Sequence, residues 1–180
     1  MTSEKIIDIL KNGKIHLSCE LFPPKQGAEL QNSLEIVNKI AASKPSYMSV
    51  TYGAGGSTVG YSAALAKKVE DNGMPALAHL TCVKADEAKL AEVLGQLQGF
   101  GVKNILALRG DIPADMHGEE IGSFAHASEL MRFVKQQGDF CVGGAAYPEG
   151  HPESGSLEQD IEKTKYQGDA GVDLLMTPMV

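Results

Sequence analysis

Short apolar runs that each end in a polar residue recur at a nearly constant spacing along this chain. Six such strand-end markers are separated by 31, 30, 30, 36 and 30 residues: Glu20, Thr51, Thr81, Asp111, Tyr147 and Thr177. This spacing is close to the length of one strand followed by one helix. Helical patterns of apolar residues fill the intervals, such as Leu90, Val93, Leu94 and Leu97. A strand following a helix at this spacing predicts parallel strands joined by right-handed crossovers.

The first apolar run has two chemically different faces. One face carries Ile15, Leu17, Cys19 and Leu21, and the other carries His16, Ser18, Glu20 and Phe22. Strands of a doubly wound sheet are apolar on both faces, whereas barrel strands turn an apolar face to the outer helices and a face that becomes polar at the rim to the inside. We therefore predict an α/β fold of the (β/α)8 TIM-barrel type with about six βα units, which is an incomplete barrel. No Pro- or Ser-rich linker divides the chain, so we expect residues 1–180 to form a single domain.

Composition restricts the class of partner. The 180 residues are 43% hydrophobic and 22% charged, with a formal net charge of -7 at pH 7. Nucleic acids and anionic membranes bind basic surfaces, so we expect this acidic chain to bind neither of them. No apolar run approaches the roughly 20 residues of a membrane-spanning helix, and the N-terminus lacks the apolar core of a signal peptide. Cys19, Cys82 and Cys141 are widely separated, as expected of reduced thiols, and we predict a cytoplasmic location.

The most informative polar cluster is Arg109-Gly110-Asp111, which directly follows the apolar run 104–108. The carboxyl ends of parallel strands meet at one rim, where α/β proteins place their binding sites. The polar clusters that follow the other runs should therefore converge with this one. No group of residues has the spacing of a metal site, and no strand ends in a lysine suited to Schiff-base chemistry, so neither a metal enzyme nor a barrel aldolase is favoured.

Five motifs in order resemble the methylenetetrahydrofolate reductase family. They are Ser-Cys-Glu-Leu-Phe-Pro-Pro-Lys at 18–25, Ser-Val-Thr-Tyr-Gly-Ala at 49–54, His-Leu-Thr-Cys at 79–82, Ala-Leu-Arg-Gly-Asp-Ile-Pro at 107–113 and Ala-Tyr-Pro-Glu-Gly-His-Pro-Glu at 146–153. The resemblance implies a flavin-bearing (β/α)8 barrel that binds FAD. It also implies reduction of 5,10-methylenetetrahydrofolate to 5-methyltetrahydrofolate, with NADH or NADPH as the electron donor, in one-carbon and methionine metabolism.

The same resemblance implies two catalytic carboxyl groups. Glu20 matches the general acid of the family, which protonates the leaving nitrogen of the folate. Asp111 matches the aspartate beside the flavin ring, whose charge adjusts the electronics of the cofactor. Structural alternatives remain open, because Glu20 could cap the first loop or pair with Lys25, and Asp111 could simply begin a turn before Pro113.

The resemblance further implies a set of cofactor contacts spread over successive strand ends. They are Thr51, His79, Arg109, Gly110, Asp111, His126, Ala127, Tyr147, His151, Asp160 and Lys163. Structural roles are open here too, since a strand-end histidine is often a buried structural residue, and an acid in the first turn of a helix, such as Asp160, is favoured there by the helix dipole. Arg109 could also pair with Asp111.

The chain departs from the family at its C-terminal end. A complete barrel takes about 250 residues, whereas this chain stops after its sixth apolar run, with Pro178 where the family has glutamine. Six strands leave two edges unpaired, so we expect a homo-oligomer or a partner chain to cover them. Two functions stay open: a folate-reducing flavoenzyme, and a non-catalytic remnant that at most binds flavin or a partner barrel.

Overall fold

A computed structural model describes residues 4–52, 59–111, 122–151 and 154–177. These residues build one six-stranded sheet in the order β1-β2-β3-β4-β5-β6, with every neighbouring pair parallel. The strands are β1 (Ser18–Leu21), β2 (Tyr47–Val50), β3 (Ala76–Thr81), β4 (Asn104–Leu108), β5 (Cys141–Ala145) and β6 (Leu174–Met176). Sequential parallel order is the order of a barrel, so the predicted fold class is confirmed.

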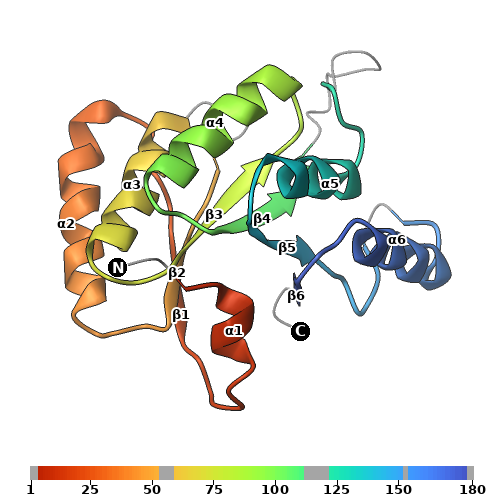
Figure 1. The fold of residues 1–180 in the computed structure, drawn as a ribbon, viewed down its shortest axis with the longest axis horizontal. Coiled ribbons are helices and arrows are strands. Elements are labelled where there is room, and N and C mark those ends of the chain that lie inside the picture. Colours follow the sequence, from red (N-terminus) through yellow and green to blue (C-terminus); the bar gives the residue numbers. More distant parts are fainter. Residues whose placement is uncertain (1–3, 53–58, 112–121, 152–153, 178–180) are drawn as a thin grey trace.

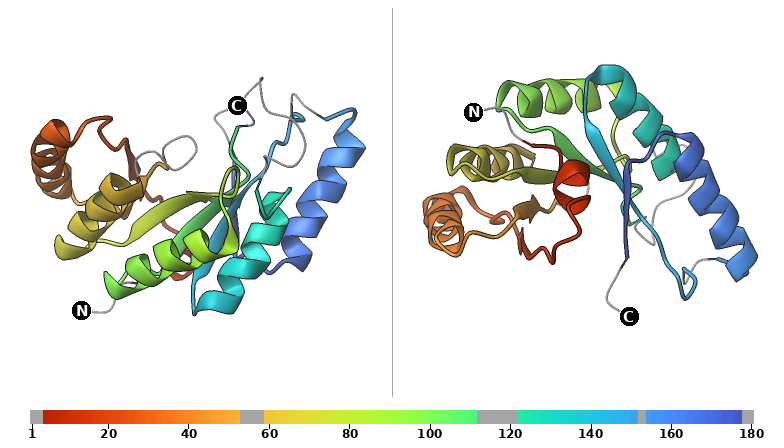
Figure 2. Two further views of the ribbon diagram at one scale, coloured as in Figure 1. Left: turned by 90° about the horizontal axis from the view of Figure 1, so that it is seen from above. Right: turned by 60° about the horizontal axis from the view of Figure 1, so that its bottom comes forward.

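Helices connect the strands along the outer side of the curled sheet. They are η1 (Gly27–Glu29), α2 (Leu30–Ala41), α3 (Val59–Asp71), α4 (Glu87–Gly99), α5 (Ala127–Gln137) and α6 (Leu157–Asp169). A short helix that precedes the first strand is α1 (Ile6–Leu10). Figures 1 and 2 show α2 to α6 in an arc around the sheet, with β1 and β6 at its two ends. The described residues therefore form an open portion of a barrel.

The two faces of the sheet bury different clusters of apolar residues. Outward-facing Met48, Val50, Leu80 and Ile105 belong to the main core, which lies between the sheet and the helices. Inward-facing residues form a smaller cluster of Ile6, Tyr47, Leu77 and Leu106. The split that we expect between an outer and an inner face is therefore present in β2, β3 and β4.

The prediction for the first strand was wrong at its beginning. Ile15 and Leu17 precede β1 and are 102% and 69% exposed, whereas we placed them on the buried face with Cys19 and Leu21. The strand begins at Ser18, opposite Tyr47 of β2, and nothing among the described residues pairs with its other edge. An edge strand without a second neighbour has no layer to bury these two side chains.

Helix α1 closes the amino-terminal end of the strands. The buried Asn104 side chain accepts a hydrogen bond from the backbone N–H of Ile6 at 2.8 Å. It donates to the carbonyls of Glu4 at 3.2 Å and Ala76 at 3.3 Å. Ile6 itself is fully buried against the inner cluster. Because this end is filled, the carboxyl-terminal rim is the end at which polar side chains can meet a ligand.

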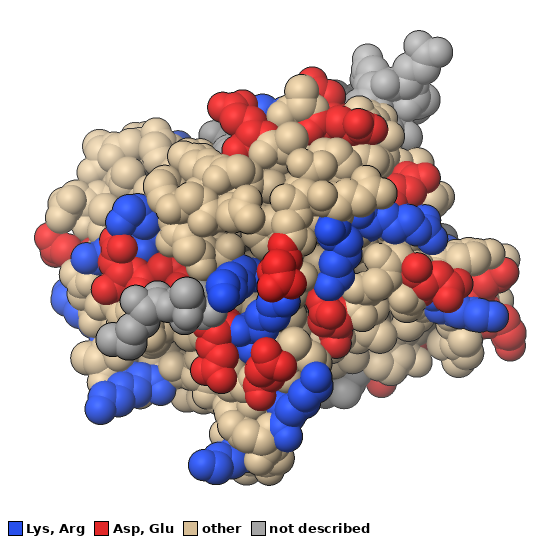
Figure 3. Space-filling model, viewed as in Figure 1, with Lys and Arg blue, Asp and Glu red and all other residues tan. Residues whose placement is uncertain are grey.

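The surface charges are mixed. On the face shown in Figure 3, Lys and Arg side chains lie among Asp and Glu side chains, and the described residues of this face present no continuous basic patch. Several of these charges are paired, as in Lys67–Asp71 on α3 and Lys135–Asp173.

Candidate active site

Three adjacent strands bring polar side chains to one carboxylate at the rim. Glu20 of β1 lies directly opposite Ser49 of β2 in the sheet register, and Ser49 lies opposite Leu77 of β3. The Ser49 hydroxyl donates to Glu20 Oε2 at 3.3 Å, and His79 Nε2 lies 3.6 Å from the same oxygen. Lys25, the alternative partner considered from the sequence, makes no ion pair with Glu20. Ser49 was missed in the sequence, although its position on the inner face of the second run was a usable signal.

His79 is a buried histidine beside a half-exposed acid. Its side chain is 11% exposed, against 46% for Glu20. Burial lowers the pKa of His79 below its usual value, and the Glu20 charge opposes this shift only in part. The imidazole is therefore neutral at pH 7. Its Nε2 atom is buried and has no hydrogen-bond partner among the described residues.

The segment 109–111 is attached to the loop that follows β3. The carbonyl of Arg109 accepts from the backbone N–H of Val83 at 3.0 Å and from Cys82 Sγ at 3.6 Å. Burial raises the pKa of the Cys82 thiol to about 11, so Cys82 stays protonated and serves as a donor here. Asp111 is exposed at the rim, at the edge of the described residues.

Gly110 is placed where only glycine fits without strain. Its φ is +88°, a conformation that residues with a side chain rarely adopt. A Cβ atom at this position would lie 3.1 Å from Thr81 Cβ. The backbone of β4 therefore passes close to the end of β3, and this contact sets the direction in which Arg109 and Asp111 leave the sheet.

The predicted cofactor contacts in the segments that follow β2 and β4 also lie at the rim. Thr51 donates its backbone N–H to Leu21 at 3.0 Å, and its carbonyl accepts from Ser62 at 3.0 Å. His126 and Ala127 stand at the N-terminus of α5, which follows the rim end of β4. Glu129 accepts from the backbone N–H of His126 at 3.1 Å and so fixes this helix end. His126 is exposed, and its side chain takes part in the capping box of α5.

The loop between β5 and α6 presents two aromatic rings. Tyr147 and His151 meet edge to face, with ring centroids 4.6 Å apart. The loop turns at Gly150, whose backbone N–H donates to the Tyr147 carbonyl at 3.0 Å. Tyr147 is 39% exposed, so one side of this pair faces solvent.

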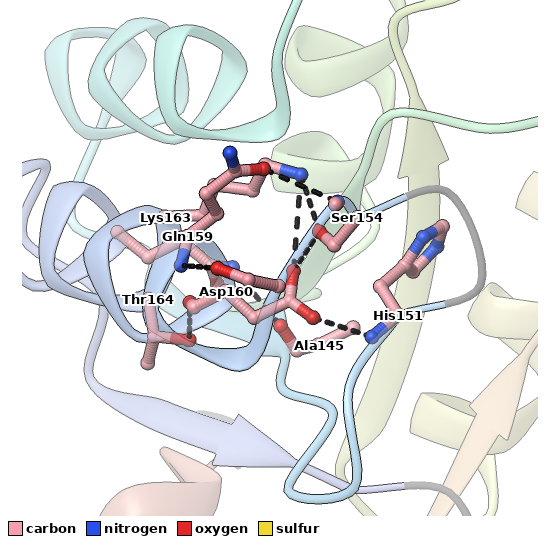
Figure 4. Close-up of polar contacts among 10 residues, drawn as sticks. Ala145, His151, Ser154, Gln159, Asp160, Lys163 and Thr164 are labelled. Atoms are coloured by element: carbon pink, nitrogen blue, oxygen red, sulfur yellow. Dashed lines mark hydrogen bonds and ion pairs between the residues drawn. The ribbon is translucent and has the colours of Figure 1, made fainter.

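Asp160, in the first turns of α6, holds this loop (Figure 4). Its carboxylate accepts from the backbone N–H of His151 and from the hydroxyl of Ser154. Lys163 donates to Ser154 at 2.7 Å and lies 3.7 Å from the Asp160 carboxylate. The Ser154 hydroxyl, the His151 N–H and Lys163 lower the pKa of Asp160. Asp160 is only 7% exposed, so its carboxylate is directed at the protein's own loop.

The described residues contain no group of three or more His, Cys, Asp and Glu side chains that could hold a metal ion. Among the same residues, no helix is both long and apolar enough to cross a membrane.

Comparison with known structures shows the fold alone. A 2,3-dimethylmalate lyase of the PEP mutase/isocitrate lyase superfamily aligns with 96% of this chain and 61% of its own, with a TM-score of 0.65 and 13% identity. A phosphonopyruvate hydrolase aligns with 96% of this chain and 61% of its own, with a TM-score of 0.65 and 10% identity.

Comparison with known sequences is more specific. The chain is 39% identical to methylenetetrahydrofolate reductase 2 of Schizosaccharomyces pombe over 184 residues, which cover 96% of this chain and 29% of that protein. It is 34% identical to 5,10-methylenetetrahydrofolate reductase of Escherichia coli K12 over 166 residues, which cover 92% of this chain and 55% of that protein. The chain thus spans about half the length of the bacterial relative and less than a third of the length of the fungal one. The family profile for methylenetetrahydrofolate reductase matches residues 5–180. The chain belongs to the methylenetetrahydrofolate reductase family.

Proposed function

We propose that this chain carries the acid-bearing part of a flavin-dependent reductase that converts 5,10-methylenetetrahydrofolate to 5-methyltetrahydrofolate. The observation that carries the proposal is the Glu20 carboxylate at the open rim, with Ser49 and His79 at one of its oxygens. Its position in the first strand is that of the family's general acid. The reduction feeds one-carbon and methionine metabolism, and the three free thiols fit a reducing cytoplasm.

The donor groups along the rim fit FAD. The proposed contacts follow the ends of β2 to β5 and the start of α6: Thr51, His79, Arg109, Gly110, Asp111, His126, Ala127, Tyr147, His151, Asp160 and Lys163. Arg109 and Lys163 supply cationic donors suited to phosphate oxygens, and the exposed side of the Tyr147–His151 pair offers flat surface to a ring. Gly110 has no side chain, and this permits its close approach to Thr81 after the rim end of β4.

The flavin, when bound, supplies the hydride. The protein must supply a proton, because the methylene carbon becomes electrophilic only after the folate ring opens. Glu20 donates that proton to the leaving nitrogen, and the bond between this nitrogen and the methylene carbon breaks as its electron pair moves to the nitrogen. Asp111 lies at the same rim, where its carboxyl group would stand beside a bound flavin and adjust its electronics. The electron donor is a reduced nicotinamide, and a relative from Zea mays is named for NADH.

A partner that covers the open edges is part of the proposal. Leu17 and Phe22, beside β1, are 69% and 71% exposed. At the other end of the sheet, Leu175 of β6 and Ile161 of α6 are 43% and 62% exposed. Large apolar side chains beside unpaired strand edges favour association. A second copy or a partner barrel would bury them.

The alternative function is a non-catalytic form that binds flavin or a partner barrel without reducing folate. Each edge strand has one neighbour only among the described residues, and a partner barrel would pair with these edges.

Flavin content and turnover separate the two functions. If the chain is a reductase, the purified protein binds FAD, NADH bleaches the flavin absorbance, and added 5,10-methylenetetrahydrofolate restores it while 5-methyltetrahydrofolate forms. Protein that binds FAD and is not bleached by NADH supports the alternative. Protein that binds no FAD at any concentration contradicts the reductase and leaves the alternative of a form that binds a partner barrel only. The double variant Tyr147→Ala/Arg109→Ala is the control, because it removes the proposed ring and phosphate contacts.

A further inference from the structure

Two donors from two different strands converge on a single oxygen of Glu20. The Ser49 hydroxyl is 3.3 Å from Oε2, and His79 Nε2 is 3.6 Å from the same Oε2. The sheet register produces this convergence, because β1, β2 and β3 are neighbours and Glu20, Ser49 and His79 all lie on the inner face. Both of these contacts are made to Oε2, and neither is made to the second oxygen, Oε1.

The protonation state of His79 determines what it can offer. Its pKa is lowered by burial, so the ring is neutral and has one N–H and one lone pair. Nε2 is buried and without a hydrogen-bond partner among the described residues, and it faces a carboxylate oxygen. A lone pair at Nε2 would repel that oxygen, whereas an N–H would be attracted to it. The arrangement therefore selects the tautomer with its proton on Nε2, and a closure of a few tenths of an ångström converts the contact into a hydrogen bond.

Two donors at Oε2 determine where the proton of a neutral Glu20 resides. A proton on Oε2 would face the Nε2–H of His79, which cannot accept it, while a proton on Oε1 meets no such donor. After the Oε1–H bond breaks and the proton joins the folate nitrogen, the resulting carboxylate keeps both donors on Oε2. The same pair therefore orients the acid before the transfer and stabilises its anion afterwards.

We propose that Ser49 and His79 are positioning residues that anchor Oε2 of Glu20, so that Oε1 is the oxygen that delivers the proton. The inference rests on the proposed function for its chemistry. The anchoring itself is a property of the protein without ligand and can be measured there.

NMR of the uniformly ¹⁵N-labelled chain tests the anchoring without FAD or folate. The ¹⁵N shifts of His79 should show the Nε2–H tautomer near pH 7. In Glu20→Gln the pKa of His79 should fall further, because the carboxylate charge that opposes the burial effect is gone. The control Glu92→Gln removes an exposed acid that pairs with Lys89 on α4, and His79 should titrate as in the unchanged protein. An Nδ1–H tautomer, or an equal His79 pKa in Glu20→Gln and the unchanged protein, overturns the inference.

Kinetics of two His79 variants test the positioning role. Glutamine can place an amide N–H near the position of Nε2, whereas leucine has the volume and no donor. In His79→Leu, the rate constants of both half-reactions are compared with those of the unchanged protein. The rate constant of folate reduction should fall by about 10-fold or more beyond any fall in the rate constant of flavin reduction by NADH, which is the scale of one preorganised donor. In His79→Gln the rate constants of folate reduction and of flavin reduction should fall by similar factors, because the glutamine amide supplies the donor. Equal losses in both steps for His79→Leu would make His79 a cofactor contact only and overturn the inference. If the protein proves inactive with folate, the proposed function fails while the NMR result still decides whether Oε2 is anchored.

Discussion

The carboxylate of Asp160 accepts the backbone N–H of His151, a residue nine positions earlier on the other side of a loop. This bond joins the first turns of α6 to the segment that presents the Tyr147–His151 ring pair. Asp160 is one of the cofactor contacts that the family resemblance implies. In the structure its carboxylate binds the loop, so it can influence a ligand through the position of His151.

Asp160→Asn should loosen this loop and weaken FAD binding by up to about 10-fold, the effect of losing one good hydrogen bond. The pKa of Asp160 is lowered in the folded state, so its stabilising contribution is present above the pKa of an unfolded aspartate and is lost as pH falls through the lower, folded value. The stability difference between the two proteins should therefore shrink as the pH becomes strongly acidic. Thermal melts between about pH 2 and pH 7, which include the acidic range in which such a contribution is lost, and FAD titrations measure both effects.

A control variant on the same helix shows whether a loss of FAD affinity comes from the loop or from the removal of any acidic side chain on α6. Glu162→Gln removes an acid that accepts a hydrogen bond from the exposed Tyr166, and it should leave FAD affinity unchanged. A loss of affinity as large as that in Asp160→Asn would refute the role of the loop.

Gly110→Ala should destabilise the fold by about 1–2 kcal/mol, because alanine is strained at a φ of +88° and its Cβ would press on Thr81. FAD binding should weaken in parallel, since the strain falls at the rim. Gly95→Ala is the matched control: Gly95 lies within α4 with open space at its Cβ, and alanine there should stabilise by about 0.5–1 kcal/mol. Urea unfolding of both variants gives the comparison, and a neutral Gly110→Ala would contradict the close approach of the two strands.

Asn104→Ala should cost about 2–3 kcal/mol of unfolding free energy, because the buried amide bonds Ile6, Glu4 and Ala76 and its loss leaves buried backbone groups unpaired. Asn72→Ala removes an exposed asparagine that bonds Asn38 and Lys68, and should change stability by about 0.5 kcal/mol or less. Similar losses of unfolding free energy in the two variants would show that α1 contributes little to closing the amino-terminal end of the strands.

Glu20→Gln should slow folate reduction by about 100-fold more than it slows flavin reduction by NADH, because only the folate step needs a proton on the leaving nitrogen. Asp111→Asn should slow both steps to a similar degree, since the flavin takes part in both. Stopped-flow spectroscopy of each half-reaction makes the comparison. Equal losses in both steps for Glu20→Gln would require the general-acid role to be withdrawn.

The open edges should cause association that depends on protein concentration. Phe22→Ser and Leu175→Ser remove one exposed apolar side chain from each end of the sheet, and together they should lower the oligomer fraction measured by light scattering after size exclusion. Ile36→Ser, on α2 away from both edge strands, is the control for a simple change in surface polarity. A chain that stays monomeric at millimolar concentration would contradict the proposed partner at the edges.

Local patterns were sufficient to predict the order of the elements. The spacing of about 30 residues and the apolar stripe at Leu90, Val93, Leu94 and Leu97 depend on periodicities that each strand and helix carries by itself. The prediction failed at Ile15 and Leu17, because their burial depends on a neighbouring strand that the described residues do not include.

The sequence by itself determined the fold class, the family and the set of residues that reach the rim, because these depend on residue type and spacing. Only the tertiary structure decided which atoms meet. Pairing in register brought Ser49 and His79 to the same oxygen of Glu20, and the path of the β5–α6 loop directed Asp160 at His151 instead of outward. The two contacts of Glu20 join residues 29 and 59 positions apart and depend on strand register. The bond between Asp160 and His151 spans nine positions and depends on the path of the loop. Register and loop path are both set by the packing of the whole sheet.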